Sequence, residues 1–136
     1  MKIHKLVFNS EPKSIHLLKD WLDVLAVKYN ICDELYPDIL ISLTEAVNNA
    51  IHHGNKCDAN KRIMLVCNVK KHKMKFKVMD EGEGFNEKKL PNPLSNERIT
   101  LENGRGVMIM KNLAHEIRFK KHGTMVEMTF KFKSIS

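Results

Sequence analysis

The stretch that decides the fold is residues 43–54, which read LTEAVNNAIHHG. Their period predicts an amphipathic helix with one face buried in the core. Gly54 is predicted to end this helix as its C′ residue, because glycine adopts the left-handed backbone conformation easily. The apolar residues that recur at steps of three and four, beginning just before the stretch, are Ile39, Leu43, Ala46, Val47, Ala50 and Ile51.

The same helix carries two polar residues, Glu45 and Asn49, one turn apart. Side chains at i and i+4 lie on the same side of a helix, with Cβ atoms about 6 Å apart. A carboxylate beside a neutral amide oxygen suits a general base next to Mg²⁺, which takes oxygen ligands and shares them with substrate phosphates. The alternative is that both residues belong to an ordinary solvent-exposed helix face.

The chain before this helix predicts one strand and one further helix. Residues 3–8 form a short apolar run that is typical of a strand. Ser10, Glu11 and Pro12 follow as a helix-start signal, with Ser10 as the capping residue. A helix-period stripe of apolar residues then continues to about Asn30.

The chain after the helix predicts two hairpins with a helix between them. Residues 62–69 and 73–79 alternate apolar and polar side chains and are predicted to pair as an antiparallel hairpin. Residues 86–103 show no period, a helix is predicted from about 104 to 115, and 116–121 with 124–132 form the closing hairpin. This order of elements indicates an α+β fold with helices layered on a mostly antiparallel sheet.

The bulk composition is that of one ordinary globular domain. The chain has 136 residues, 43% hydrophobic and 29% charged, and a net charge of +7. Its lysines alternate with apolar residues, as at Lys73, Lys75 and Lys77, which is typical of the solvent-exposed face of a half-buried strand. An acidic protein or nucleotide partner is the second interpretation of the charge, and we expect no direct nucleic-acid binding.

The sequence also predicts a cytoplasmic protein without membrane attachment. No apolar run approaches the roughly 18 residues needed to span a bilayer, and the first ten residues lack a secretory signal. The chain has three cysteines, Cys32, Cys57 and Cys67. Because their number is odd and none are spaced as CxxC, a disulfide framework is not expected, and we predict reduced thiols.

A second motif, Asp80-x-Gly82-x-Gly84, follows the strand predicted at 73–79. A carboxylate at a strand end can accept a hydrogen bond from the exocyclic amine of adenine. Guanine has an acceptor oxygen at that place, so this arrangement would favour ATP over GTP. The glycines would let the backbone approach a flat ring closely. The alternative is an ordinary turn, because turns are rich in Asp and Gly.

A third motif, Gly104-Arg105-Gly106, stands at the start of the helix predicted at 104–115. Unpaired backbone N–H groups and the helix dipole make such a start an anion site, to which Arg105 would add charge. The alternative is a hinge before a packed helix. The chain contains no GxxxxGK[ST] P-loop and none of the HRD or DFG signatures of protein kinases.

The three motifs together, in this order and on these elements, resemble the N, G1 and G2 boxes of the Bergerat-fold ATPases, which include histidine kinases and gyrase. The small size and the sequences TEAVNNAIHHG and NGRGVMIM narrow the resemblance to the bacterial anti-sigma-factor serine/threonine kinases of the stress-response and sporulation type. The resemblance implies that residues 1–136 form one histidine-kinase-like ATPase domain. Its fold would be a two-layer α/β sandwich with helices on one face of a mixed, mostly antiparallel sheet.

The resemblance also assigns roles to single residues. Glu45 would be the catalytic base and Asn49 the Mg²⁺ ligand. Asp80 would bind adenine, and residues 86–103 would form the ATP lid. The other residues that would line the ATP site are Gly82 and Gly84 beside adenine, Gly104, Arg105, Gly106 and Val107 at the phosphates, and His53 and Thr124.

The function implied by the resemblance is an ATP-dependent serine/threonine kinase that regulates transcription as an anti-sigma factor. Such a protein phosphorylates a small anti-anti-sigma protein, sequesters a sigma factor, and often forms a homodimer. Two other functions are compatible with the same residues: an ATP-gated binding module without phosphotransfer, and a stand-alone ATPase in which Glu45 activates water.

Overall fold

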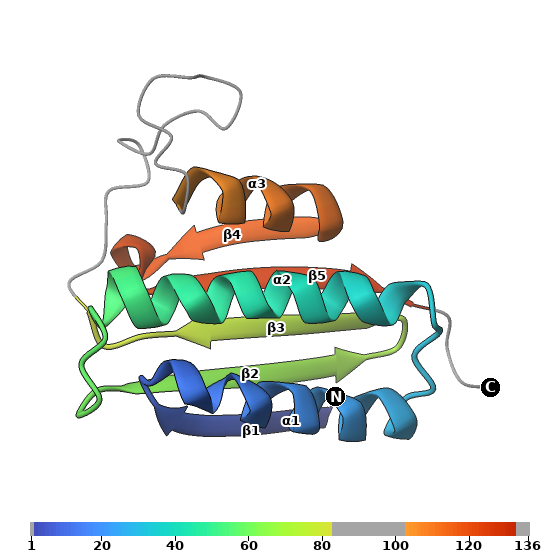
Figure 1. Ribbon diagram of the computed structural model, residues 1–136. Coiled ribbons are helices and arrows are strands. Elements are labelled where there is room, and N and C mark those ends of the chain that lie inside the picture. The colour runs from blue at the N-terminus through green and yellow to red at the C-terminus, as the bar shows by residue number, and fades with distance from the viewer. Residues whose placement is uncertain (1, 83–102, 133–136) are drawn as a thin grey trace.

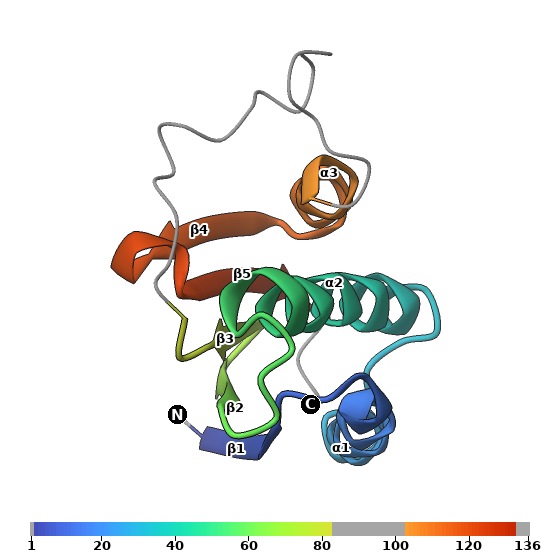
Figure 2. The same ribbon diagram turned by 60° about the vertical axis from the view of Figure 1, so that its left-hand side comes forward.

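The computed structural model describes residues 2–82 and 103–132 of the chain. In this part of the chain, one five-stranded sheet is covered on one face by three α-helices (Figures 1 and 2). The strands are β1 (Lys2–Asn9), β2 (Arg62–Lys70), β3 (Lys73–Met79), β4 (Glu116–Lys120) and β5 (Met125–Lys131). The helices are α1 (Ile15–Lys28), α2 (Leu35–Asn49) and α3 (Asn103–Leu113), with 3₁₀ turns at Pro12–Ser14 and Lys121–Gly123 and a π-helical turn at Ala50–Gly54.

The strand order is β1-β2-β3-β5-β4, and every described pairing is antiparallel. The predicted α+β class, the two layers and both hairpins are therefore confirmed. The central pairing joins β3 to β5, so that Met79 at the end of β3 lies opposite Met125 at the start of β5. This pairing brings Asp80, just beyond β3, to the residue before β5, and the Asp80 N–H donates to the Thr124 carbonyl over 2.9 Å.

The core lies between the helical layer and the sheet, where the predicted apolar stripes meet. Leu43 on α2 is fully buried, and Phe76 at the centre of β3 packs edge-to-face against both Trp21 of α1 and Phe130 of β5, each with ring centroids 6.1 Å apart. Such aromatic contacts add to the stabilisation that burial gives. The other fully buried large side chains are Leu18, Leu22, Ile39, Ile51, Ile63, Leu65, Met74, Met110 and Met128.

Gly54 differs from its prediction. It is the last residue of a π-helical turn that continues α2, and its φ is not positive; among the described glycines only Gly123 has a positive φ, 86°. The Asn55 N–H closes the π turn by donating to the Ala50 carbonyl over 2.7 Å. Glycine at position 54 leaves room for Asp80: a Cβ atom there would be 2.3 Å from the Asp80 Oδ2, so the Asp80 carboxylate would have to move.

Ser10 also differs from its prediction as a helix cap. Its hydroxyl is buried and bonds to no described residue, while its backbone N–H donates to the Lys61 carbonyl over 2.9 Å. The chain enters α1 through the 3₁₀ turn at Pro12–Ser14 instead. Ser10 stands too early to reach the first turn of the helix, although Pro12 does occupy the first position of a helical turn, as predicted.

The face of the sheet opposite the helices carries the lysines, as their alternation predicted. One carboxylate is nevertheless buried there: Glu127 on β5 is 6% exposed and pairs with Lys75 at 3.5 Å and Lys120 at 3.0 Å. Burial acts to raise the pKa of Glu127, but the two lysines outweigh it and hold that pKa below its usual value.

No helix among the described residues is long and apolar enough to cross a membrane.

We expect Glu127→Gln to lower the free energy of unfolding by about 1–2 kcal/mol at pH 7, because the lysines lose a charged hydrogen-bond partner. A carboxyl whose pKa is lowered by folding stabilises the protein above its unfolded pKa and loses this effect in acid. The difference from the wild type should therefore shrink as the pH falls below about 4, measured by urea unfolding at several pH values. Glu116→Gln, at an exposed carboxylate of the same face, is the control and should change stability by less than about 0.5 kcal/mol at pH 7.

Candidate functional site

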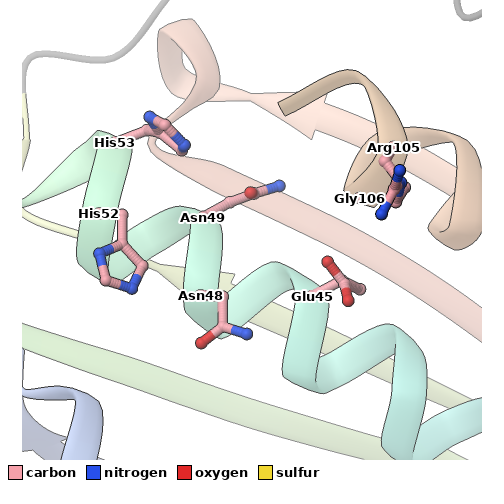
Figure 3. Close-up of a pocket in the computed structure, with 7 residues that line it drawn as sticks. All are labelled: Glu45, Asn48, Asn49, His52, His53, Arg105 and Gly106. Carbon is pink, nitrogen blue, oxygen red and sulfur yellow. The ribbon is translucent and has the colours of Figure 1, made fainter. Parts of the chain in front are cut away.

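A pocket of about 330 Å³ lies between the C-terminal half of α2 and the first turn of α3 (Figure 3). Glu45 and Asn49 both face it, as their spacing predicted. Arg105 and Gly106 form the side that belongs to α3. The residues that line the pocket are Glu45, Asn48, Asn49, His52, His53, Arg105 and Gly106.

Gly106 lets α3 approach α2 closely at this pocket. A Cβ atom on Gly106 would lie 2.8 Å from the Glu45 Oε2 and 3.5 Å from the Asn49 Nδ2. Real Cβ atoms do not approach a carboxylate oxygen that closely, so a larger residue at 106 would require the flexible Glu45 side chain to move aside. The first and third sequence motifs are thus in direct contact, although 57 positions separate Asn49 from Gly106.

The first turn of α3 offers the pocket positive charge. The N–H groups of a first helical turn have no partner within their helix, and the helix dipole is positive at that end. Gly104 and Arg105 belong to this turn, and the Arg105 side chain is exposed. Val107, in contrast, is partly buried and packs against the hydrophobic core. An anion in the pocket would meet backbone N–H groups and a guanidinium on one side.

Asp80 lies against Gly54, the last residue of the π-helical turn that continues α2. Its Oδ1 accepts the Gly82 N–H over 2.8 Å, and its carboxylate lies against the α-carbon of Gly54. Burial raises the pKa of Asp80, although the bond from Gly82 and the charge of Lys61 act in the opposite direction. Asp80 is therefore a partly buried carboxylate that its surroundings in the described chain do not fully compensate.

Gly82, like Gly54, has no free space for a side chain. A Cβ atom on Gly82 would lie 2.0 Å from the Gly54 carbonyl oxygen, which belongs to backbone and cannot rotate aside. The end of the π-helical turn and the loop after β3 are thus in backbone contact. This contact joins the first and second motifs, so α2 with its π turn connects all three.

A profile of the histidine kinase-like ATPase domain matches residues 8–130, which include all five strands and all three helices apart from the first six residues of β1 and the last residue of β5. The chain belongs to the histidine kinase-like ATPase family. The family membership inferred from the three motifs is confirmed, and the two-layer fold agrees with it.

Individual members of the ATPase family are similar to this chain over most of its length. The serine-protein kinase RsbW of Bacillus subtilis is 26% identical over 127 residues, which cover 88% of this chain and 79% of that protein. The anti-sigma F factor of Clostridium acetobutylicum is 34% identical over 104 residues, covering 72% of this chain and 71% of that protein.

The fold has a counterpart among solved structures of the family. The crystal structure of the RsbU and RsbW domains of Rv1364c from Mycobacterium tuberculosis superposes with a TM-score of 0.67 at 14% sequence identity. The superposition covers 98% of this chain and 33% of that one, so this chain spans about a third of the longer protein. At that identity the likeness concerns the fold alone.

The described part of this ATPase domain brings most of the predicted site residues together. Glu45, Asn49, His53, Arg105 and Gly106 line one pocket, and Gly104 belongs to the adjoining turn. Asp80, Gly82 and Thr124 meet at the end of β3, where the Thr124 hydroxyl donates to the Lys121 carbonyl over 2.8 Å. Gly84 and the predicted lid lie outside the described residues, except that Asn103 begins α3.

Sequence reasoning missed three residues near the site. Asn48 and His52 line the pocket beside Glu45 and Asn49. Asn55 is buried next to the loop that carries Asp80. The spacing from Glu45 could have placed Asn48 and His52, because they follow it by three and seven positions on one helix face. No comparable signal marks Asn55.

Proposed function

We propose that this chain is an ATP-dependent serine/threonine protein kinase that acts as an anti-sigma regulatory factor. The observation that carries the proposal is the meeting of Glu45, Asn49 and Gly106 in one pocket at the start of α3. This arrangement puts a carboxylate and an amide oxygen opposite an anion-binding helix start. A nucleotide whose phosphates lie at that start would have its terminal phosphate near Glu45.

In the proposed reaction Glu45 acts as general base. Its carboxylate accepts the proton of a serine or threonine hydroxyl, and the hydroxyl oxygen forms a bond to the γ-phosphorus of ATP. The bond from that phosphorus to the bridging oxygen breaks, ADP leaves, and the partner carries a phosphate ester. Arg105 and the N–H groups of the first α3 turn would stabilise the negative charge of the phosphates.

The donor set fits a magnesium ion. Asn49 offers a neutral amide oxygen beside the Glu45 base, and Mg²⁺ takes one or two protein oxygens together with phosphate oxygens and water. Among the described residues no group of three or more His, Cys, Asp or Glu side chains could hold a metal ion by itself. Asn49 would hold the Mg²⁺, which would neutralise phosphate charge when bound.

The names of the relatives support the proposed partners. RsbW is a serine-protein kinase, and the clostridial relatives are anti-sigma F factors. By analogy, the substrate of this chain is a serine or threonine on a small anti-anti-sigma protein, and its second partner is a sigma factor. The net charge of +7 suits an acidic partner surface.

Glu45→Gln is expected to lower the rate of phosphotransfer at least about a hundredfold, because the amide cannot accept the proton. The variant should bind MgATP within a few-fold of the wild type, since the base is not needed for binding. The assay is transfer of labelled γ-phosphate to anti-anti-sigma proteins from the same genome, and Asn49→Ala serves as the variant expected to lose MgATP binding. Label released only as inorganic phosphate would identify a stand-alone ATPase. Tight ATP binding without any transfer would identify an ATP-gated binding module.

Asp80→Asn tests the proposed adenine contact. Asparagine keeps an oxygen for the Gly82 N–H but turns an N–H₂ group toward the adenine amine, so ATP affinity should fall about 10–100-fold, measured by titration calorimetry. Because burial raises the pKa of Asp80, its carboxylate lowers stability above pH 4, and the variant should melt at a higher temperature at pH 7. This difference should vanish in acid. Unchanged ATP affinity would contradict the assignment of Asp80.

We also propose a homodimer that forms through the open face of the sheet. Ile3, Val7 and Met64 are 54%, 45% and 39% exposed there, and Val7 lies directly opposite Met64 in the pairing of β1 with β2. These side chains offer a second copy an apolar surface away from the nucleotide site.

Sedimentation of the wild type should give twice the chain mass of 15.8 kDa. Val7→Glu should shift the protein toward monomer, because dimerisation would then bury a charge. Val24→Glu, at an exposed position of α1, should leave the mass unchanged. A wild-type monomer at all concentrations would exclude the dimer.

A further inference from the structure

Asn55 is the first residue after the π-helical turn, and it is only 1% exposed. Its side chain makes two hydrogen bonds of opposite sense. The Nδ2 donates to the Arg62 carbonyl over 3.0 Å, and the Oδ1 accepts the Glu81 N–H over 2.8 Å. A buried amide that satisfies both a carbonyl and an N–H group cannot be replaced by another side chain of the same size without leaving one of them unpaired.

Asn55 joins the Arg62 carbonyl, at the start of β2, to the Glu81 N–H, which lies within the loop of residues 80–82 that follows β3. Glu81 stands between Asp80 and Gly82, so its N–H is part of the peptide unit that follows Asp80. The Glu81 carboxylate accepts the Arg62 N–H over 2.5 Å, so both backbone polar groups of Arg62 are bound within this cluster. Asn55 therefore fixes the peptide that sets the direction of the Asp80 side chain.

The backbone of Asn55 is held equally firmly on the helical side. Its N–H donates to the Ala50 carbonyl over 2.7 Å, and its carbonyl accepts the Asp58 N–H over 3.0 Å. The residue before it, Gly54, touches the Asp80 carboxylate directly. Asn55 thus links the end of α2, the helix that carries Glu45 and Asn49, to the loop that carries Asp80 through its hydrogen bonds.

We infer that Asn55 is a positioning residue for nucleotide recognition: it orients the Asp80 carboxylate toward the exocyclic amine of adenine and so sets the preference for ATP over GTP. This inference rests on the proposed function. Asn55 does not touch the nucleotide in this role; it acts through Glu81 and Asp80. A purely structural asparagine would support folding and leave nucleotide preference unchanged.

The test compares three variants for binding of MgATP and MgGTP by calorimetry. Asn55→Ala removes both side-chain bonds and should weaken ATP binding about tenfold while GTP binding changes less than twofold. Asn55→Asp keeps the acceptor for the Glu81 N–H and should retain the ATP preference within about threefold, although it loses the bond to Arg62 and melts at a lower temperature. Val69→Ala removes core packing at the far end of β2 and should lower the melting temperature without changing the preference.

A second measurement does not depend on nucleotide. Hydrogen exchange of the Glu81 amide should be faster in Asn55→Ala than in Asn55→Asp, because only aspartate still accepts that N–H. If Asn55→Ala does not fold, Asn55→Ser takes its place, since the shorter hydroxyl cannot span both partners, and the same loss of ATP preference is expected.

Two results would overturn the inference. One is a melting temperature that falls in Asn55→Ala with the ATP to GTP ratio unchanged, as in Val69→Ala. The other is equal protection of the Glu81 amide in the alanine and aspartate variants. A wild type that binds neither nucleotide would refute the proposed function instead, and the exchange of the Glu81 amide would still decide whether Asn55 positions the loop.

Discussion

The structure depends on the backbone contact between the end of the π-helical turn and the loop after β3. A Cβ atom on Gly82 would collide there with the backbone of Gly54, and a Cβ atom on Gly54 would collide with the Asp80 carboxylate. This contact fixes where α2 lies along the sheet. Glu45 precedes Gly54 by nine residues, so the last turn of α2 and the π turn separate the proposed base from Asp80 along the helix axis. The contact and the helix together set the spacing that a nucleotide would have to span.

A second close approach, at Gly106, fixes the other side of the site. The first turn of α3 lies against the side chains of Glu45 and Asn49, and the missing side chain of Gly106 leaves room for the Glu45 carboxylate. Packed helices have few stable arrangements, so a shift of α3 would move its N–H groups and Arg105 together. Glycines at 54, 82 and 106 thus serve one purpose, which is to let polar groups from three distant segments share a small space.

The sequence predicted those parts of the fold that depend on local period. The stripe on α2 and the alternation on β2 and β3 each follow from which side chains must be buried, and both appear in the structure. It predicted a glycine of special importance at 54 but for the wrong reason. Whether a glycine serves a positive φ or a close approach depends on the segment that lies against it, and here that segment is 26 positions away at Asp80. The role that we propose for Asn55 was invisible for a similar reason, because Glu81, whose N–H its side chain accepts, is 26 positions away.

The buried carboxylate of Glu127 and the partly buried carboxylate of Asp80 differ in how the described chain compensates their charge. Glu127 is compensated by Lys75 and Lys120, and its pKa is lowered. Asp80 has one backbone N–H and the more distant charge of Lys61, and its pKa is raised. A protein that needed Asp80 only for stability would gain by replacing it with a neutral residue, since its ionised form is disfavoured where it stands. A carboxylate kept under such conditions is understandable if a ligand supplies the missing donor, and the exocyclic amine of adenine is a donor of that kind.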